Sequence, residues 1–103
     1  MSTYHLTVFI VVLTYQCDLA EIDDAIPDHS AWLDVNYAEG VFVASGRRVP
    51  RVGGVILANG VTRDELDRRL CLDPLATRGL ATYDVIEFDP SRTSPEIASL
   101  TSP

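Results

Sequence analysis

The strongest constraint on the fold lies near the N-terminus, where all the residues from 8 to 13 are apolar. They belong to a longer stretch, residues 4–15, which is rich in Val, Ile, Phe, Thr and Tyr and contains neither Gly nor Pro. This composition predicts a β-strand. Because successive side chains of a strand point to opposite faces of its sheet, the apolar run indicates that both faces are buried. The run is too short to span a membrane as a helix, which needs roughly 20 residues.

A helix is expected over residues 21–39. Asp23 or Asp24 would cap it, and Pro27 would lie in its first turn, where a missing N–H breaks no helical hydrogen bond. Gly40 would end it in the left-handed conformation. One side of this helix is an apolar stripe with a histidine at its centre: Ile22, Ile26, His29, Leu33 and Tyr37.

The remaining segments complete an alternating pattern. They are, in chain order, strands over 41–45 and 53–59, a helix over 63–72 that opens on the capping box Thr62-Arg63-Asp64-Glu65, and a strand over 82–88. The order β-α-β-β-α-β predicts an α+β fold of ferredoxin-like topology with a four-stranded antiparallel sheet. We expect one domain over residues 1–90 and a C-terminal tail over 91–103, with a helical turn at 95–100.

The second helix and the sheet carry two further predictions. The helix is expected to turn Leu66 and Leu70 inward and its arginines (Arg63, Arg68, Arg69) outward. Two helices cover only one face of a four-stranded sheet, although the first three strands are apolar on both faces. Soluble monomers avoid such large apolar surfaces, so the chain is expected to form a homodimer that packs sheet against sheet about a two-fold axis.

Charge narrows the choice of partners. The net charge is −7, and all 8 basic residues are Arg, which argues against a nucleic-acid partner. Residues 1–40 carry seven acids and no Arg, whereas residues 41–52 carry three Arg and no acid. This asymmetry indicates either a loop that steers an anionic small molecule or partner, or a solvated loop at the rim of a dimer.

The termini and cysteines indicate a cytoplasmic protein. No positively charged segment precedes the first apolar run, so no signal peptide is expected, and no membrane partner either. Cys17 and Cys71 lie far apart in the sequence and form no C-x-x-C pair, which predicts two reduced thiols without a bridge between them.

Three segments resemble motifs of the YciI family. Residues 26–33 (IPDHSAWL) resemble its R-P-x-H-L-x-x-L segment, and residues 39–46 (EGVFVASG) resemble its E-G-x-L-x-x-(A/S)-G-P strand. Residues 73–80, with Asp73-Pro74-Leu75 and Gly79-Leu80, resemble its D-P-(F/Y)-x-x-x-G segment. The chain departs from these motifs at three positions: Ile26 in place of Arg, Arg47 in place of Pro and Leu75 in place of an aromatic residue.

The resemblance implies a dimeric α/β-barrel assembly with a cleft in which a His and an Asp meet. Some members are linked to lyase, dehalogenating or isomerase-like chemistry, so the resemblance implies a small-molecule substrate. The three departures lie at the implied site, and no relative's substrate is carried over to this chain.

His29 and Asp73 are the candidate catalytic residues. A histidine can donate or accept a proton near neutral pH, and a carboxylate can orient it and stabilise its charged form. The alternatives are a buried His29 bound to a backbone carbonyl, and an Asp73 that serves only the local turn before Pro74.

Ser45 and Arg47 are the candidate substrate-binding residues. Ser45 lies at a strand end, and Arg47 could clamp a carboxylate, although packing and solvation are the alternatives. His5 and His29 are too isolated to predict a metal site, and no cofactor-binding motif is present.

Two functions follow. The first is a cofactor-free lyase or isomerase in which His29 acts as general acid or base, assisted by Asp73. The second is a non-catalytic dimeric module that binds a small molecule or serves as an accessory protein. A pocket that brings together His29, Asp73 and Ser45 would favour the enzyme, whereas a cleft filled by Trp32 or Leu75 would favour the module.

Overall fold

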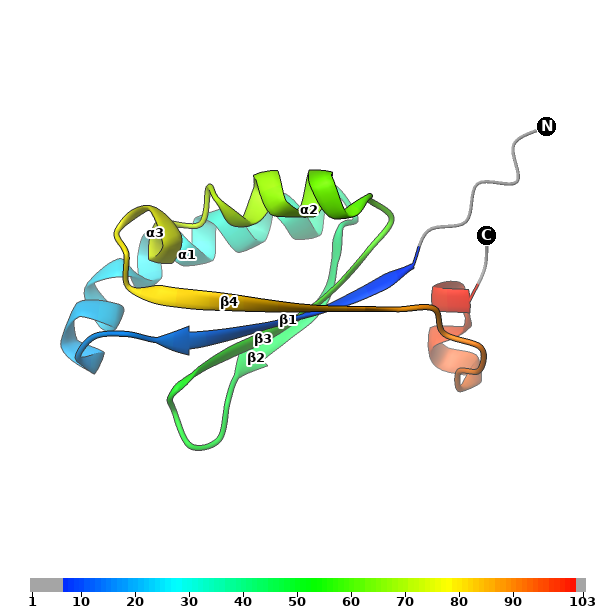
Figure 1. Ribbon diagram of the computed structural model, residues 1–103, viewed down its shortest axis with the longest axis horizontal. Helices are drawn as coiled ribbons and strands as arrows, with labels where there is room; N and C mark the ends of the chain where they lie inside the picture. Colours follow the sequence, from blue (N-terminus) through cyan, green and yellow to red (C-terminus); the bar gives the residue numbers. More distant parts are fainter. Residues whose placement is uncertain (1–6, 102–103) are drawn as a thin grey trace.

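The computed structural model describes residues 7–101, which form a four-stranded antiparallel sheet with its α-helices on one face (Figure 1). The elements are β1 (Val8–Tyr15), α1 (Leu19–Ala38), β2 (Phe42–Arg47), β3 (Gly53–Asn59), α2 (Arg63–Leu70), α3 (Pro74–Thr77), β4 (Ala81–Phe88) and the 3-10 segment η1 (Pro95–Thr101). The strand order is β2-β3-β1-β4. The predicted ferredoxin-like α+β fold is therefore confirmed, while the part of the first strand expected at residues 4–6 lies outside the described residues.

Strand β1 occupies the centre of the sheet, between β3 and β4. Its odd-numbered residues Phe9, Val11 and Leu13 belong to the core and are at most 2% exposed. Ile10 and Val12 alternate with them and are only partly buried. The apolar run thus contributes side chains to both faces of the sheet, and those on the helix-covered face are the better buried.

Helix α1 begins earlier than predicted, directly after Asp18, whose carbonyl accepts hydrogen bonds from the first turn. Pro27 therefore lies inside the helix, and its placement in the first turn was wrong. A proline at this position donates no hydrogen bond to the carbonyl of Asp23, one turn earlier. The predicted end is confirmed, since Gly40 has φ 76°.

The buried face of α1 is rotated relative to the predicted stripe. Its buried residues are Ile22, Ala25, Trp32 and Asn36, whereas Tyr37 is 39% exposed. The other members of the predicted stripe are only half-buried, along the flank of this face. A flank position leaves a side chain free to line a pocket.

Helix α2 is capped as predicted at one end. Thr62 Oγ1 accepts a hydrogen bond from the backbone N–H of Glu65 at 3.2 Å, but the Glu65 carboxylate binds Arg68 and Arg69 instead of completing the capping box. The outward orientation predicted for Arg69 was wrong. Its guanidinium donates to Asn36 and to Glu39 on the α1 side, at 3.0 and 2.6 Å, and so links the two helices.

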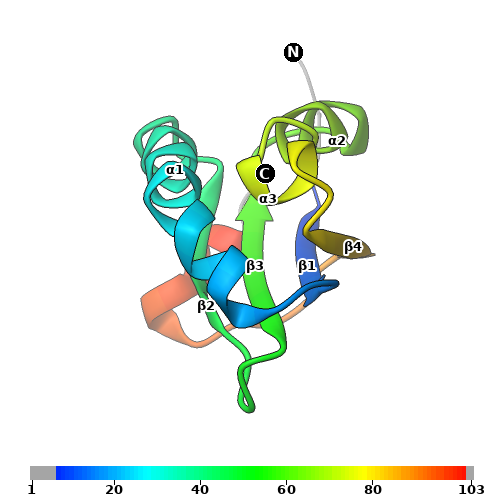
Figure 2. The ribbon, with the colours of Figure 1, turned by 90° about the vertical axis from the view of Figure 1, so that its left-hand side faces the viewer.

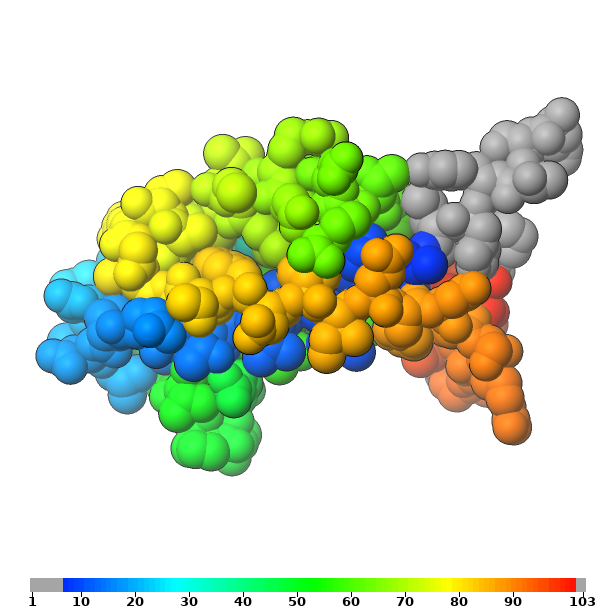
Figure 3. Space-filling model, viewed as in Figure 1, coloured from blue at the N-terminus to red at the C-terminus, as the bar shows by residue number. Residues whose placement is uncertain are grey.

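The helix-free face of the sheet is covered only at one end. Figures 1 and 2 show η1 on this face, near the start of β1. Large apolar side chains remain exposed on it, namely Val55 (38%) and Ile86 (53%) and, opposite Val8 at the start of β1, Phe88 (40%). In the space-filling view, the β2–β3 loop and the C-terminal segment project from the body at separate places (Figure 3).

The prediction that β2 is buried on both faces was wrong in part, because only Phe42 of that strand is buried.

Candidate functional site

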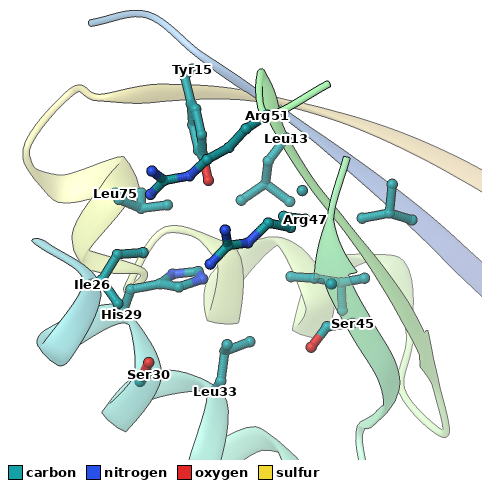
Figure 4. A pocket seen from close by; sticks show the side chains of 14 residues that line it. Leu13, Tyr15, Ile26, His29, Ser30, Leu33, Ser45, Arg47, Arg51 and Leu75 are labelled. Atoms are coloured by element: carbon teal, nitrogen blue, oxygen red, sulfur yellow. The ribbon is translucent and has the colours of Figure 1, made fainter. Parts of the chain in front are cut away.

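A pocket of about 220 Å³ opens between α1, α3 and the helix-covered side of β1, β2 and β3 (Figure 4). Leu13, Ile56 and Leu75 give it an apolar lining. Its polar groups come from several parts of the chain. His29 and Ser30 lie on α1, and Ser45 and Arg47 lie on β2. Tyr15 at the end of β1 and Arg51 in the β2–β3 loop complete the lining. The pocket therefore combines an apolar lining with a few convergent polar side chains, as small-molecule sites do.

A β-bulge in β2 puts Ser45 and Arg47 on the pocket side. Phe42 pairs with Ala58, but the next pair is Ala44 with Leu57, so the register shifts between these two pairs. Without the shift, alternation would place the even-numbered residues of β2 on the same face as Phe42. The extra residue reverses this parity, so Ser45 and Arg47 join Phe42 on the helix-covered side.

His29 and Asp73 lie in hydrogen-bond contact, with 2.7 Å between Nδ1 and Oδ1. Asp73 is 0% exposed and does not itself line the pocket, so it lies behind the imidazole. Its Oδ1 also accepts from the backbone N–H of Leu75 at 3.0 Å, and its Oδ2 accepts from the hydroxyl of Tyr83 at 2.6 Å. These charge-assisted hydrogen bonds compensate the burial of the carboxylate.

The second ring nitrogen of His29 has no hydrogen bond to any residue in the described range 7–101. An ionised carboxylate only accepts hydrogen bonds, so Nδ1 carries the proton when the imidazole is neutral. Nε2 then holds a lone pair, and the ring extends from α1 toward Arg47 (Figure 4). The alternative of a backbone-bound core histidine is wrong, because the partner is a side-chain carboxylate and the ring lines a pocket.

Tyr83 is a site residue that sequence reasoning missed. Burial, and the neighbouring Asp73 carboxylate, raise the pKa of Tyr83, so the phenol remains a donor. Tyr83 lies within the strand predicted over 82–88, but nothing in the sequence paired it with Asp73. Hydrogen bonding explains why a tyrosine occupies this inward position.

Ser45 and Arg47 both line the pocket but differ in their contacts. The hydroxyl oxygen of Ser45 lies 2.7 Å from that of Tyr37. The backbone of Arg47 pairs with Gly54 in the sheet, but its guanidinium makes no hydrogen bond or ion pair with any other residue from 7 to 101. Ser45 is therefore held in place by the protein, whereas the donors of Arg47 are available to a ligand.

Arg51 also lines the pocket, although the sequence indicated only a general basic loop. Its Nη2 pairs with Asp23 of α1, and this hydrogen bond lowers the pKa of Asp23 and raises that of Arg51. Its Nε is buried and has no hydrogen-bond partner within the described range 7–101. No carboxylate is among the pocket-lining residues found in the described part of the chain.

Other expectations concern metals, membranes and thiols. Within residues 7–101, no group of three His, Cys, Asp or Glu side chains could hold a metal ion. None of the helices over the same range is long and apolar enough to cross a membrane. Cys17 and Cys71 are both free, which confirms the prediction that they are not bridged.

Comparisons with known proteins agree with this architecture. The family model of the YCII-related domain matches residues 8–89, and no curated protein sequence matches the chain. The 5-chloro-2-hydroxyhydroquinone dehydrochlorinase TftG of Burkholderia phenoliruptrix AC1100, in complex with 2,5-dihydroxybenzoquinone, superposes with a TM-score of 0.68. That alignment has 16% identity and covers 79% of this chain and 92% of TftG.

A second similar structure is SnoaB, a cofactor-independent oxygenase from Streptomyces nogalater. It superposes with a TM-score of 0.54 at 21% identity, and the alignment covers 89% of this chain and 99% of SnoaB. At these identities the likeness concerns the fold alone, which is the ferredoxin-like α+β arrangement.

Proposed function

Because the chain belongs to the YCII-related domain family, and because its pocket presents an oriented histidine, we propose that it is a small-molecule acid/base enzyme of the cofactor-free lyase or isomerase type. His29 is the general acid or base, and Asp73 orients it. Ser45 and Arg47 bind the substrate. The two similar structures, a dehydrochlorinase and a cofactor-independent oxygenase, support a catalytic role on small molecules.

The observation that carries the proposal is the asymmetric environment of the His29 ring. One nitrogen is held at 2.7 Å by a fully buried carboxylate, and the other has no partner among the described residues and lies at an open pocket. Burying a carboxylate is costly unless hydrogen bonds compensate it. A carboxylate that fixes the tautomer of a pocket histidine is an arrangement that serves general acid–base catalysis.

The proposed reaction begins when Nε2 of His29 accepts a proton from an acidic C–H or O–H group of the substrate. In a lyase, the electron pair of the broken bond forms a new double bond, and a leaving group departs with its own electron pair. The imidazolium, stabilised by Asp73, then gives its proton to the leaving group or to water. In an isomerase, the same proton returns to a different atom of the substrate.

A non-catalytic module is the alternative, and the pocket argues against it. That hypothesis expected the cleft to be filled by Trp32 or Leu75. Trp32 is buried against Phe42, with 5.2 Å between ring centroids, and is not a lining residue. Leu75 contributes to the pocket wall and leaves about 220 Å³ open.

The proposal includes a cytoplasmic homodimer. The exposed apolar side chains of the helix-free face would be buried if this face packed against the same, equally apolar face of a second copy. The β2–β3 loop and the C-terminal segment project on either side of this face (Figures 1 and 3) and would flank the partner. The two free thiols suit a reducing compartment.

Proton exchange tests the function without knowledge of the natural substrate. The protein is incubated in D₂O with a panel of 2-oxo acids, 1,3-dicarbonyl compounds and hydroxyquinones, and deuterium uptake at carbon is followed by NMR. We expect catalysed exchange for at least one class, and its loss in His29→Asn. Saturable binding without exchange in any class would favour the non-catalytic module.

A further inference from the structure

The pocket is positively charged although the protein as a whole is acidic. The chain has 15 acidic residues and a net charge of −7, yet the charged lining residues of the pocket are Arg47 and Arg51. A cleft lined by one sign of charge attracts ligands of the other sign. We infer that the substrate of this site is a small carboxylate, and that Arg47 and Arg51 bind its carboxylate group while His29 faces its reacting atoms.

Arg47 is placed and equipped for this contact. The bulge in β2 turns it to the helix-covered side, and its side chain reaches into the pocket toward His29 (Figure 4). Its guanidinium has five N–H donors in a planar fork, and no residue in the described range takes a hydrogen bond or ion pair from it. A carboxylate matches two of these donors at once.

Arg51 adds a second positive charge at the edge of the pocket. Asp23 holds its Nη2 and thereby fixes the guanidinium there. Tyr15, another lining residue, also interacts with this guanidinium. Arg51 therefore contributes a fixed positive charge to the site, whereas Arg47 contributes the donors that contact the carboxylate.

Charge balance and size restrict the ligand further. Asp23 pairs with Arg51, so Arg47 is the lining guanidinium that has no carboxylate bound to it among residues 7–101, which favours a singly charged carboxylate over a phosphate dianion. The volume of about 220 Å³ is smaller than the about 300–1,000 Å³ typical of pockets for drug-sized ligands. Together with the apolar lining of Leu13, Ile56 and Leu75, this volume suits a carboxylate with one ring or a short branched chain.

This inference rests on the proposed function for the place of the substrate, but the binding that it predicts does not require turnover. The probes are therefore benzoate, its neutral analogue benzamide and inorganic phosphate. Binding is measured by chemical-shift titration of backbone amides, in which Gly46 and Gly54 report on the pocket. We expect saturable shifts with benzoate and at least tenfold weaker binding of benzamide and phosphate.

Variants assign the binding to the two arginines. Arg47→Gln should weaken benzoate binding at least tenfold, and it should not disturb the fold because the Arg47 guanidinium has no protein partner among residues 7–101. Arg47→Lys keeps the charge but loses the planar fork. Its affinity for benzoate should therefore lie between those of the wild type and Arg47→Gln. Arg68→Gln is the matched control, since it removes an equal charge from an exposed position on α2, and its affinity should stay within twofold of the wild type.

Arg51→Gln should also weaken benzoate binding, by removing a positive charge from the edge of the pocket. The inference is overturned if benzoate and benzamide bind equally, if phosphate binds more tightly at the same amides, or if Arg47→Gln binds benzoate like the wild type. Benzoate binding that persists in the absence of any exchange activity would leave this inference standing and remove the proposed function. Exchange of neutral carbonyl compounds without benzoate binding would support the proposed function and overturn this inference.

Discussion

Asp73 combines both roles that the sequence left open for it. Its Oδ1 accepts the backbone N–H of Leu75 and so caps α3, as expected of an Asp before Pro. The same oxygen lies 2.7 Å from His29 Nδ1, and Oδ2 accepts the Tyr83 hydroxyl. One side chain thus holds both the local turn and the site. Loss of the Asp73 carboxylate would remove the cap of α3 and the contacts with His29 and Tyr83 together.

Tyr83 is predicted to hold Asp73 in position. Tyr83→Phe leaves Oδ2 of a buried carboxylate without a donor, which should lower the free energy of unfolding by about 1–2 kcal/mol. Urea unfolding followed by the fluorescence of Trp32, the single tryptophan, measures this change. The control is Tyr37→Phe, because the Tyr37 hydroxyl bonds only Ser45 in an exposed pair and its loss should stay within about 0.5 kcal/mol. Equal losses in the two variants would contradict the role of Tyr83.

The residues of the site differ in how far they could be predicted. Helical spacing placed His29 on a partly buried face, and the resemblance paired it with Asp73, 44 positions away. Tyr83 and Arg51 could not be found in this way. Their roles depend on contacts between segments that only the folded backbone brings together, namely Tyr83 with Asp73 and Arg51 with Asp23.

At the scale of elements, the two main helices are joined by a polar network rather than by apolar packing alone. Arg69 donates to Asn36 and Glu39 on the α1 side and to Glu65 within α2. Trp32 donates its indole N–H to the Arg69 carbonyl at 3.0 Å. The position of α1 relative to α2, and with it the position of His29, depends on these contacts.

Acid should weaken this network through Glu65. Hydrogen bonds from Arg68 and Arg69 lower the pKa of Glu65 from its ordinary value of 4.5. The folded state therefore favours the charged form, and its contribution to stability is present above about pH 4.5 and lost as the pH falls through the lower folded pKa. Between about pH 5 and about pH 3, the melting temperature of the wild type should fall more than that of Glu65→Gln.

The control for this titration is Glu96→Gln, which makes the same charge change at an exposed residue of η1 that has no ion pair with any residue from 7 to 101. Its melting curve should follow that of the wild type across the whole pH range. Parallel curves for the wild type and Glu65→Gln would contradict the account of Glu65.

The elements themselves were largely predictable, and the exceptions have local causes. Alternation and capping patterns identified the strands and helices in the correct order. Pro27 was misplaced because the residue that caps the helix is Asp18, and not Asp23 or Asp24 as expected. The bulge in β2 was not predictable, since one extra residue in a strand leaves no signature in its composition, and yet it decides which side chains face the pocket.

At the scale of the whole molecule, the helix-free face is the main unexplained surface. η1 covers one end of it, and the apolar side chains of β3 and β4 stay exposed. An exposed apolar sheet face is unusual for a soluble monomer. The proposed dimer accounts for this surface.

A charge placed on this face should dissociate the dimer. Ile86 is 53% exposed and shares its side of the sheet with Ile10, so Ile86→Glu should convert a dimer into a folded monomer at micromolar concentration. Light scattering gives the mass, and circular dichroism checks the fold. The control is Leu72→Glu, which adds the same charge at a residue that is 69% exposed between α2 and α3 and should remain dimeric. A monomeric wild type would refute the dimer.

The central claim is that Asp73 fixes His29 so that Nε2 presents its lone pair to the pocket. The most direct measurement is ¹⁵N NMR of the imidazole, which identifies the protonated nitrogen of the neutral ring. The account predicts a proton on Nδ1 and a bare Nε2 in the wild type, with a shift toward the other tautomer in Asp73→Asn. A neutral ring protonated on Nε2 in the wild type would contradict the claim, because that nitrogen could then accept no proton from a substrate.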